Sequence, residues 1–205
     1  MNKKKTWNTR SVALTALLAA LYGAYVFYFA VTSFGPLQVR VVDALLPLSV
    51  LFGLPAIAGV TIGCFIGNLL GSPIGIVDIV GGPVANFVAA TLAWAVTRRK
   101  FRGGWVLAVV IEIASVTLIV GSYLVAWAAA PGVPVWVGWA EFLGSEILAI
   151  GVLGYPLLKA VDRATRRNIV LGTQNPKTVV SRGSPSYTLS WDSLYSFAAT
   201  VLGEA

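Results

Sequence analysis

Long apolar stretches follow one another along most of the chain, separated by short breaks that contain glycine, proline or charged residues. Several stretches hold about 20 residues, the length that a helix needs to cross the hydrocarbon core of a bilayer. Breaks that contain proline end helices, because proline cannot continue the hydrogen-bonding pattern. The pattern predicts helices at residues 12–34, 44–54, 55–70, 76–96, 105–129 and 137–158.

The second predicted helix is shorter than the others. At 1.5 Å per residue, residues 44–54 would extend about 17 Å, whereas the bilayer core is about 30 Å thick. Pro47 lies inside this stretch. We therefore expect a short helix that is partly sunk in the membrane, or a bend at Pro47. The preceding residues, 37–43, alternate between apolar and polar side chains, which predicts an extended segment.

Composition agrees with a membrane protein. The chain of 205 residues is 57% hydrophobic and 11% charged, with a mean hydropathy of +0.81. This is far more apolar than an ordinary soluble domain. The net charge is +7, but the Lys and Arg residues flank apolar segments of membrane length instead of gathering on one solvated face. This distribution argues against a nucleic-acid-binding protein.

The positive charges also predict the topology. All Lys and Arg residues except Arg40 lie at the N-terminal end, in the loop at 98–102 or from Lys159 onward. Such clusters mark the cytoplasmic side. The three cationic clusters lie on the same side of the membrane only if the short helix at residues 44–54 crosses it. We predict an all-α integral protein of the cell membrane: a multi-pass bundle of six transmembrane helices with cytoplasmic N and C termini. Residues 1–167 form this domain, and residues 168–205, rich in Ser, Thr, Gly, Asn and Pro, form a flexible cytoplasmic tail.

Acidic residues inside the apolar stretches indicate the function. A charged side chain within a membrane helix costs about 2.5 kcal/mol or more, so it is usually retained for a purpose. In the predicted topology, polar residues from four segments converge on the outer half of the membrane or near its midplane, and Arg40 is the only cation among them. Such a pocket suits a ligand with several N–H donors or a positive charge. The predicted substrate-binding residues are Gln38, Arg40, Asp43, Asn68, Asp78, Asn86, Glu112, Glu141 and Glu146.

Other kinds of chemistry are absent from the sequence. It has no His and one Cys, which excludes His-based metal sites, Ser-His hydrolysis and an internal disulfide. It contains no G-x-x-x-x-G-K-[ST] motif for ATP and no two long similar halves. We interpret the chain as a substrate-binding subunit, not an enzyme, with no catalytic residues, metal or cofactor. A proton-coupled carrier using Glu112 and Glu146, or an intramembrane enzyme with a carboxylate pair, remains an alternative.

Small residues recur at every fourth position on two predicted helices. Gly59, Gly63, Gly67 and Gly71 form one face of the third helix, which allows another helix backbone to approach closely. Ala16, Ala20 and Ala24 form a flat stripe on the first helix. The alanine stripe can pack within the bundle or dock another membrane protein.

Four segments, in this order and spacing, resemble the QueT family. They are VRVVDAL at 39–45, GVTIGCFIGNLL at 59–70, GIVDIVG at 75–81 and GYPL at 154–157. QueT proteins are substrate-binding S components of energy-coupling factor (ECF) vitamin transporters. The resemblance implies the six-helix ECF S-component fold and a queuosine precursor, a 7-deazaguanine base, as substrate. An S component for another vitamin also fits an acidic pocket.

The resemblance also implies partners. An S component is driven by a transmembrane coupling subunit and two ATPase subunits. Docking is implied to use an alanine-rich face of the first helix, matched here by Ala16, Ala20 and Ala24.

Overall fold

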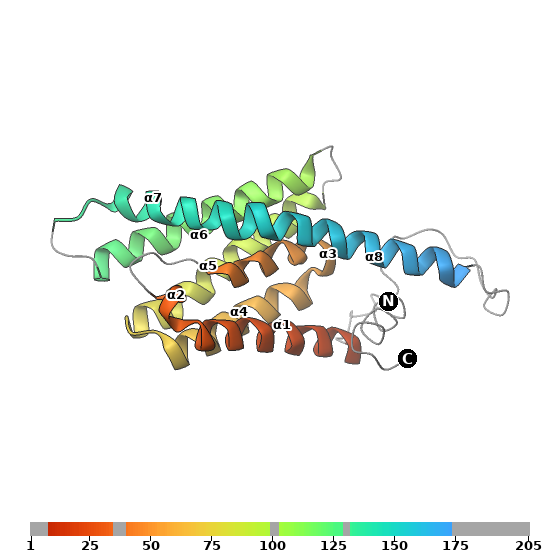
Figure 1. Ribbon diagram of the computed structural model, residues 1–205, viewed down its shortest axis with the longest axis horizontal. Helices are drawn as coiled ribbons and strands as arrows, with labels where there is room; N and C mark the ends of the chain where they lie inside the picture. The colour runs from red at the N-terminus through yellow and green to blue at the C-terminus, as the bar shows by residue number, and fades with distance from the viewer. Residues whose placement is uncertain (1–7, 35–39, 99–102, 129–131, 174–205) are drawn as a thin grey trace, which may run out of the picture. The chain divides into compact units, whose positions relative to one another are not determined.

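The computed structural model describes residues 8–34, 40–98, 103–128 and 132–173, and all of its regular elements in these ranges are helices (Figure 1). The described helices are α1 (Thr9–Tyr28), α2 (Ala30–Ser33), η1 (Val41–Leu48), α3 (Ser49–Phe52), α4 (Leu54–Gly71), α5 (Ile76–Thr97), α6 (Gly104–Ala128), α7 (Val135–Glu146), η2 (Ile147–Gly154) and α8 (Tyr155–Thr173).

Five helical segments within these ranges are long and apolar enough to cross a membrane, as the sequence predicts. They are α1, α4, α5, α6 and the continuous helix that begins with α7 and runs through η2 into α8. The ends of α4, α5 and α6 lie within a few residues of the predicted ones. By contrast, α1 ends at Tyr28 and not at residue 34, and the last helix continues beyond the predicted end at residue 158 to Thr173. Gly53 and Gly75 precede α4 and α5 with φ of 63° and 84°, a conformation that favours glycine.

The short predicted helix is longer than expected and begins as a 3₁₀ helix. It comprises η1, which contains Pro47, and α3. A 3₁₀ helix rises about 2.0 Å per residue, so Val41–Phe52 extends about 22 Å instead of the expected 17 Å.

The structure corrects the predicted extended segment at its C-terminal end. Residues 41–43 are helical, and the backbone N–H of Asp43 donates to the Arg40 carbonyl at 2.9 Å. In a 3₁₀ helix, residues three apart share a face. The polar pattern therefore arises because Arg40 and Asp43 both point into the protein, where each is buried.

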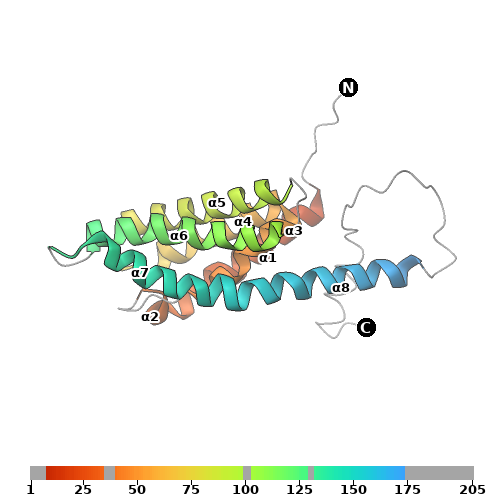
Figure 2. The ribbon, with the colours of Figure 1, turned by 90° about the horizontal axis from the view of Figure 1, so that it is seen from above.

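The chain divides into two compact units, residues 1–157 and 158–205. In the first unit, α1 packs along α4, α4 along α5, α5 along α6 and α6 along α7, while η1 packs against η2 (Figures 1 and 2). In the second unit, α8 continues to Thr173, and Arg166 forms an exposed ion pair with Asp162 at 2.8 Å. The predicted boundary between a membrane domain at 1–167 and a tail at 168–205 stays a prediction, and residues 174–205 lie outside the described ranges.

The glycine face of α4 forms the contact with α1, so another helix backbone approaches it closely, as the sequence predicts. An added Cβ at Gly63 would lie 2.6 Å from the Tyr22 Cβ and 2.7 Å from the Ala19 carbonyl oxygen. At Gly67 it would lie 2.6 Å from the Val26 Cβ. No side chain fits at these positions, so the two backbones approach closely only because α4 carries glycine there.

We predict that Gly63→Ala lowers the thermal unfolding temperature of the protein in detergent. The added methyl group meets a backbone oxygen that cannot move away, and overpacking of this kind costs about 1–3 kcal/mol. Gly144→Ala is the matched control, because an added Cβ on that helical glycine would meet nothing within 4 Å. Equal unfolding temperatures for the two variants would contradict this account of the contact between α1 and α4.

Candidate substrate-binding site

Polar side chains from most helices of the first unit meet in its interior. We call this group the polar cluster. Apart from Tyr123, which is partly buried, its members are almost fully buried. They are Tyr22 of α1, Arg40 directly before η1, Asp43 of η1, Asn68 of α4, Asp78 of α5, Tyr123 of α6 and Glu146 of α7.

One half of the polar cluster is an ion pair between Arg40 and Asp78, which further contacts from neighbouring side chains stabilise. The Arg40 Nη2 atom lies 3.3 Å and 3.4 Å from the two carboxylate oxygens of Asp78. The guanidinium group also packs over the Phe34 ring, 5.1 Å from its centroid. The Tyr123 hydroxyl donates to Asp78 at 2.6 Å. The charge of Asp78 is therefore balanced within the protein.

Close approach of α4 and α5 holds Asn68 against this ion pair. The Asn68 amide donates to the backbone oxygen of Asp78 at 2.8 Å. An added Cβ at Gly82 would lie 2.5 Å from the Asn68 Nδ2 atom, so the arrangement depends on glycine there. The Asn68 Oδ1 atom receives no hydrogen bond from a described residue and remains an open acceptor.

The other half of the polar cluster is a pair of carboxyl groups. The Tyr22 hydroxyl donates to Asp43, and the carboxyl groups of Asp43 and Glu146 lie close enough to interact with each other. Glu146 is 0% exposed. Neither of its oxygens receives a hydrogen from an N–H or O–H donor among the residues described here.

Two more of the predicted residues are buried in the same unit. The Ser49 hydroxyl donates to Glu112 at 3.3 Å, and Glu112 lies close enough to Asp43 for the two charges to interact. The second Glu112 oxygen and the Asn86 Nδ2 atom have no hydrogen-bond partner in the described part of the chain. Unsatisfied buried polar atoms are costly, and these atoms are free to form hydrogen bonds with a bound molecule.

The structure therefore brings five of the nine predicted residues into the polar cluster and buries two others, Asn86 and Glu112. Glu141 is only partly buried on α7, and Gln38 lies outside the described residues. No group of three or more His, Cys, Asp or Glu side chains within the described ranges is arranged to hold a metal ion.

Sequence reasoning missed Tyr22, Tyr123 and Ser49. Tyrosine in membrane proteins is usually found at the interface with water, where Tyr123, near the end of its helix, would be placed by this rule. Tyr22 lies well inside α1, away from the interface with water. Its position within a predicted membrane helix could have indicated that its hydroxyl has a buried partner.

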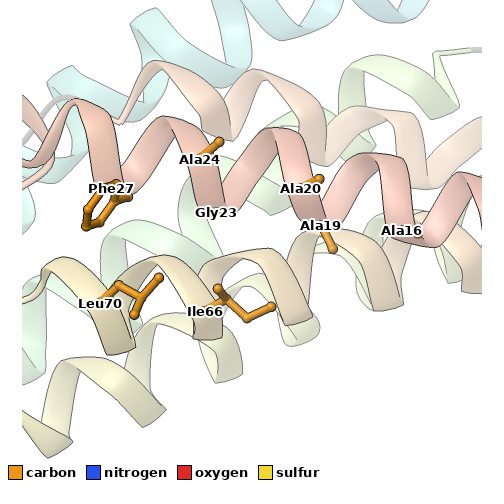
Figure 3. A pocket seen from close by; sticks show the side chains of 8 residues that line it. All are labelled: Ala16, Ala19, Ala20, Gly23, Ala24, Phe27, Ile66 and Leu70. Carbon is orange, nitrogen blue, oxygen red and sulfur yellow. The ribbon is translucent and has the colours of Figure 1, made fainter.

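The alanine stripe of α1 lies away from its packed face. Leu18, Tyr22 and Val26 are buried, whereas Ala16, Ala20 and Ala24 are exposed. Beside the stripe runs an apolar groove of about 330 Å³, with Ile66 and Leu70 of α4 along its other wall (Figure 3).

The chain matches a protein-family model described as QueT transporter over residues 12–163. Neither a search of curated proteins nor a search of solved structures found a match.

We predict that Asp78→Asn strongly destabilises the protein in detergent, because it leaves the buried Arg40 without its countercharge. Removing one member of a buried ion pair costs about 3–5 kcal/mol. Tyr123→Phe is the control, since it removes one neutral donor to the same carboxylate, and a hydrogen bond to a charged group contributes about 1.5–3 kcal/mol. The account of the ion pair fails if thermal unfolding shows Asp78→Asn to be the milder change.

Proposed function

The chain belongs to the QueT transporter family, whose model covers most of its length, and from this premise we propose that it is the substrate-capture (S) subunit of an ATP-driven ECF-type importer. It is a multi-pass membrane protein, and its family performs transport. The proposed substrate is a queuosine precursor, a 7-deazaguanine base. The observation that carries the proposal is the set of open hydrogen-bond acceptors in the polar cluster, above all both oxygens of Glu146.

The chemistry of the polar cluster suits this substrate class. A 7-deazaguanine presents an N1–H and an exocyclic amine on one edge, and a carboxyl group such as that of Glu146 can accept both. A bond of this kind to a charged group contributes about 1.5–3 kcal/mol. The open Asn86 Nδ2 atom would donate to the carbonyl group, whereas Asn68, whose Nδ2 atom already donates to Asp78, would offer its open Oδ1 atom to a further N–H group. The ion pair of Arg40 with Asp78 would fix the wall of the site.

The other predicted residues take supporting roles in this proposal. Asp43 lies beside Glu146, and Glu112 lies near Asp43. Both acids would set the charge of the site. Gln38 and Glu141 would contribute from the entrance, on the outer side.

We further propose that the first unit crosses the membrane six times, with both termini in the cytoplasm. At about 22 Å, Val41–Phe52 is still shorter than the bilayer core of about 30 Å, so this sixth crossing would also need the residues on either side of the helix. The distribution of Lys and Arg supports the orientation.

The topology yields a direct prediction. Reporters fused after Arg102 and after Arg167 should both be cytoplasmic, because six crossings put both cationic clusters on the same side as the N terminus. A reporter inserted at 132–134 should be external. An external signal after Arg102 would leave only five crossings and contradict the proposal.

The proposed partners are an ECF transmembrane coupling subunit and two ATPase subunits. The chain has no ATP-binding motif of the P-loop type, so a motor must come from elsewhere. The exposed stripe of Ala16, Ala20 and Ala24 is flat enough for the close approach of another membrane helix.

Uptake of a 7-deazaguanine by cells that contain the coupling module tests the proposed function. We expect Ala20→Trp to abolish this uptake, because the bulky ring fills the stripe, while binding to the purified chain is unchanged. Leu21→Trp is the matched control. Leu21 is exposed on the same helix but does not line the groove, so uptake should continue. Loss of both uptake and binding in Ala20→Trp would mean that the stripe serves packing within the bundle.

A self-contained proton-coupled carrier is the second candidate. It is favoured by one observation, the open oxygens of the buried Glu112 and Glu146, which a proton relay requires. Transport by the purified chain in liposomes, driven by a proton gradient with no ATPase present, would establish the carrier and exclude the S-subunit proposal.

A further inference from the structure

The carboxyl groups of Asp43 and Glu146 cannot both be charged at low cost. Both side chains are buried and close enough for their charges to interact, and two carboxylates placed in this way repel strongly when water is excluded. The nearest cation, Arg40, places its guanidinium against Asp78. If all three acids were ionised, the polar cluster would carry two uncompensated negative charges.

The hydrogen bonds indicate where a proton resolves this repulsion. Asp43 accepts from the Tyr22 hydroxyl, and a donated hydrogen bond stabilises the charged form of a carboxyl group. Glu146 receives no hydrogen from a described donor. A protonated Glu146 would donate a hydrogen bond to the Asp43 carboxylate. The proton removes one buried negative charge and turns the repulsion between the two groups into a hydrogen bond.

The surroundings of the pair offer no stronger competitor for this proton. Cys64 and Tyr22 are neutral side chains under ordinary conditions, and Asp78 already has a countercharge in Arg40. Glu112 accepts from Ser49. The titratable or charged groups that face the pair or its ion-pair neighbours are Tyr22 of α1, Arg40 before η1, Cys64 of α4, Asp78 of α5, and Glu112 and Tyr123 of α6.

We propose that Asp43 and Glu146 share one proton in the free protein, and that the N–H groups of the substrate displace it when they bind. The proton passes from Glu146 to water, and the resulting carboxylate accepts the substrate N–H groups in its place. The second step rests on the proposed function for the identity of the substrate. The shared proton itself does not, because it follows from the contacts of the free protein.

Infrared spectroscopy of the full-length protein without ligand tests the shared proton. A protonated carboxyl group has a C=O stretching band that a carboxylate lacks. Glu146→Gln should abolish the band of this pair, because it removes the group that carries the proton and supplies an amide donor to Asp43. Asp43→Asn should shift the band, because the Glu146 proton loses the carboxylate to which it is donated while Glu146 stays buried. The same replacement also preserves the shape of the site and favours correct folding.

Glu141→Gln, on the same helix as Glu146 but partly exposed, is the control and should leave the band unchanged. Loss of the band in Glu146→Gln together with a shifted band in Asp43→Asn supports the shared proton. A band that persists at an unchanged frequency in either variant overturns it.

Calorimetry with 7-deazaguanine tests the displacement. Titrations in buffers of different ionisation enthalpy should show that about one proton is released for each ligand bound, and affinity should then rise by up to about tenfold per pH unit. Binding with no proton release overturns the displacement. Absence of any binding instead contradicts the proposed function, and the infrared result then decides the shared proton alone.

Discussion

The cost of burying charge among apolar helices is the constraint on which the rest of the structure depends. Arg40 and Asp78 are both nearly inaccessible, and each is tolerable only because the other lies 3.3 Å away. Arg40 precedes η1 and Asp78 lies in the first turn of α5. The ion pair therefore ties the short irregular helix to one of the long membrane helices.

Backbone geometry gives the polar cluster its remaining members. The 3₁₀ form of η1 turns Arg40 and Asp43 to the same side, so one short segment supplies both the cation and an acid. Glycines allow α4 to pack closely against α1 and α5. This packing brings Tyr22 within hydrogen-bonding reach of Asp43, and Asn68 within reach of the Asp78 backbone. Glu146 lies immediately before η2, a π-helix, and such widened turns are frequent at functional sites.

Much of this arrangement could be predicted from the sequence. The helix ends follow from glycine, proline and charged breaks, and the isolated Arg40 among several acids indicates a buried ion pair. The sequence could not indicate that its partner is Asp78 and not Asp43, because the choice depends on how η1 packs against α5. The extended form expected for residues 41–43 was wrong, because the alternation rests on Gln38 and Arg40. Arg40 and Asp43 are instead three residues apart, the spacing of one turn of a 3₁₀ helix.

Tyr22 and Tyr123 illustrate a second limit. Each donates its hydroxyl to an acid on another helix, and such partners come together only when the bundle is assembled. By contrast, both alternatives for small-residue stripes were visible in the sequence. Exposure distinguishes them, because the glycines of α4 are in contact with α1 whereas Ala16, Ala20 and Ala24 are not covered within the first unit.

The central claim is that the polar cluster binds the substrate through Glu146. Calorimetric titration of the purified chain with a 7-deazaguanine, compared between Glu146→Gln and Glu141→Gln, tests it most directly. Glu146→Gln keeps the shape but replaces an acceptor oxygen with a donor, so affinity should fall by about tenfold to a hundredfold. Glu141→Gln, on the partly exposed part of the same helix, should change affinity much less. Unchanged affinity in Glu146→Gln would contradict the claim and make Glu146 a structural residue.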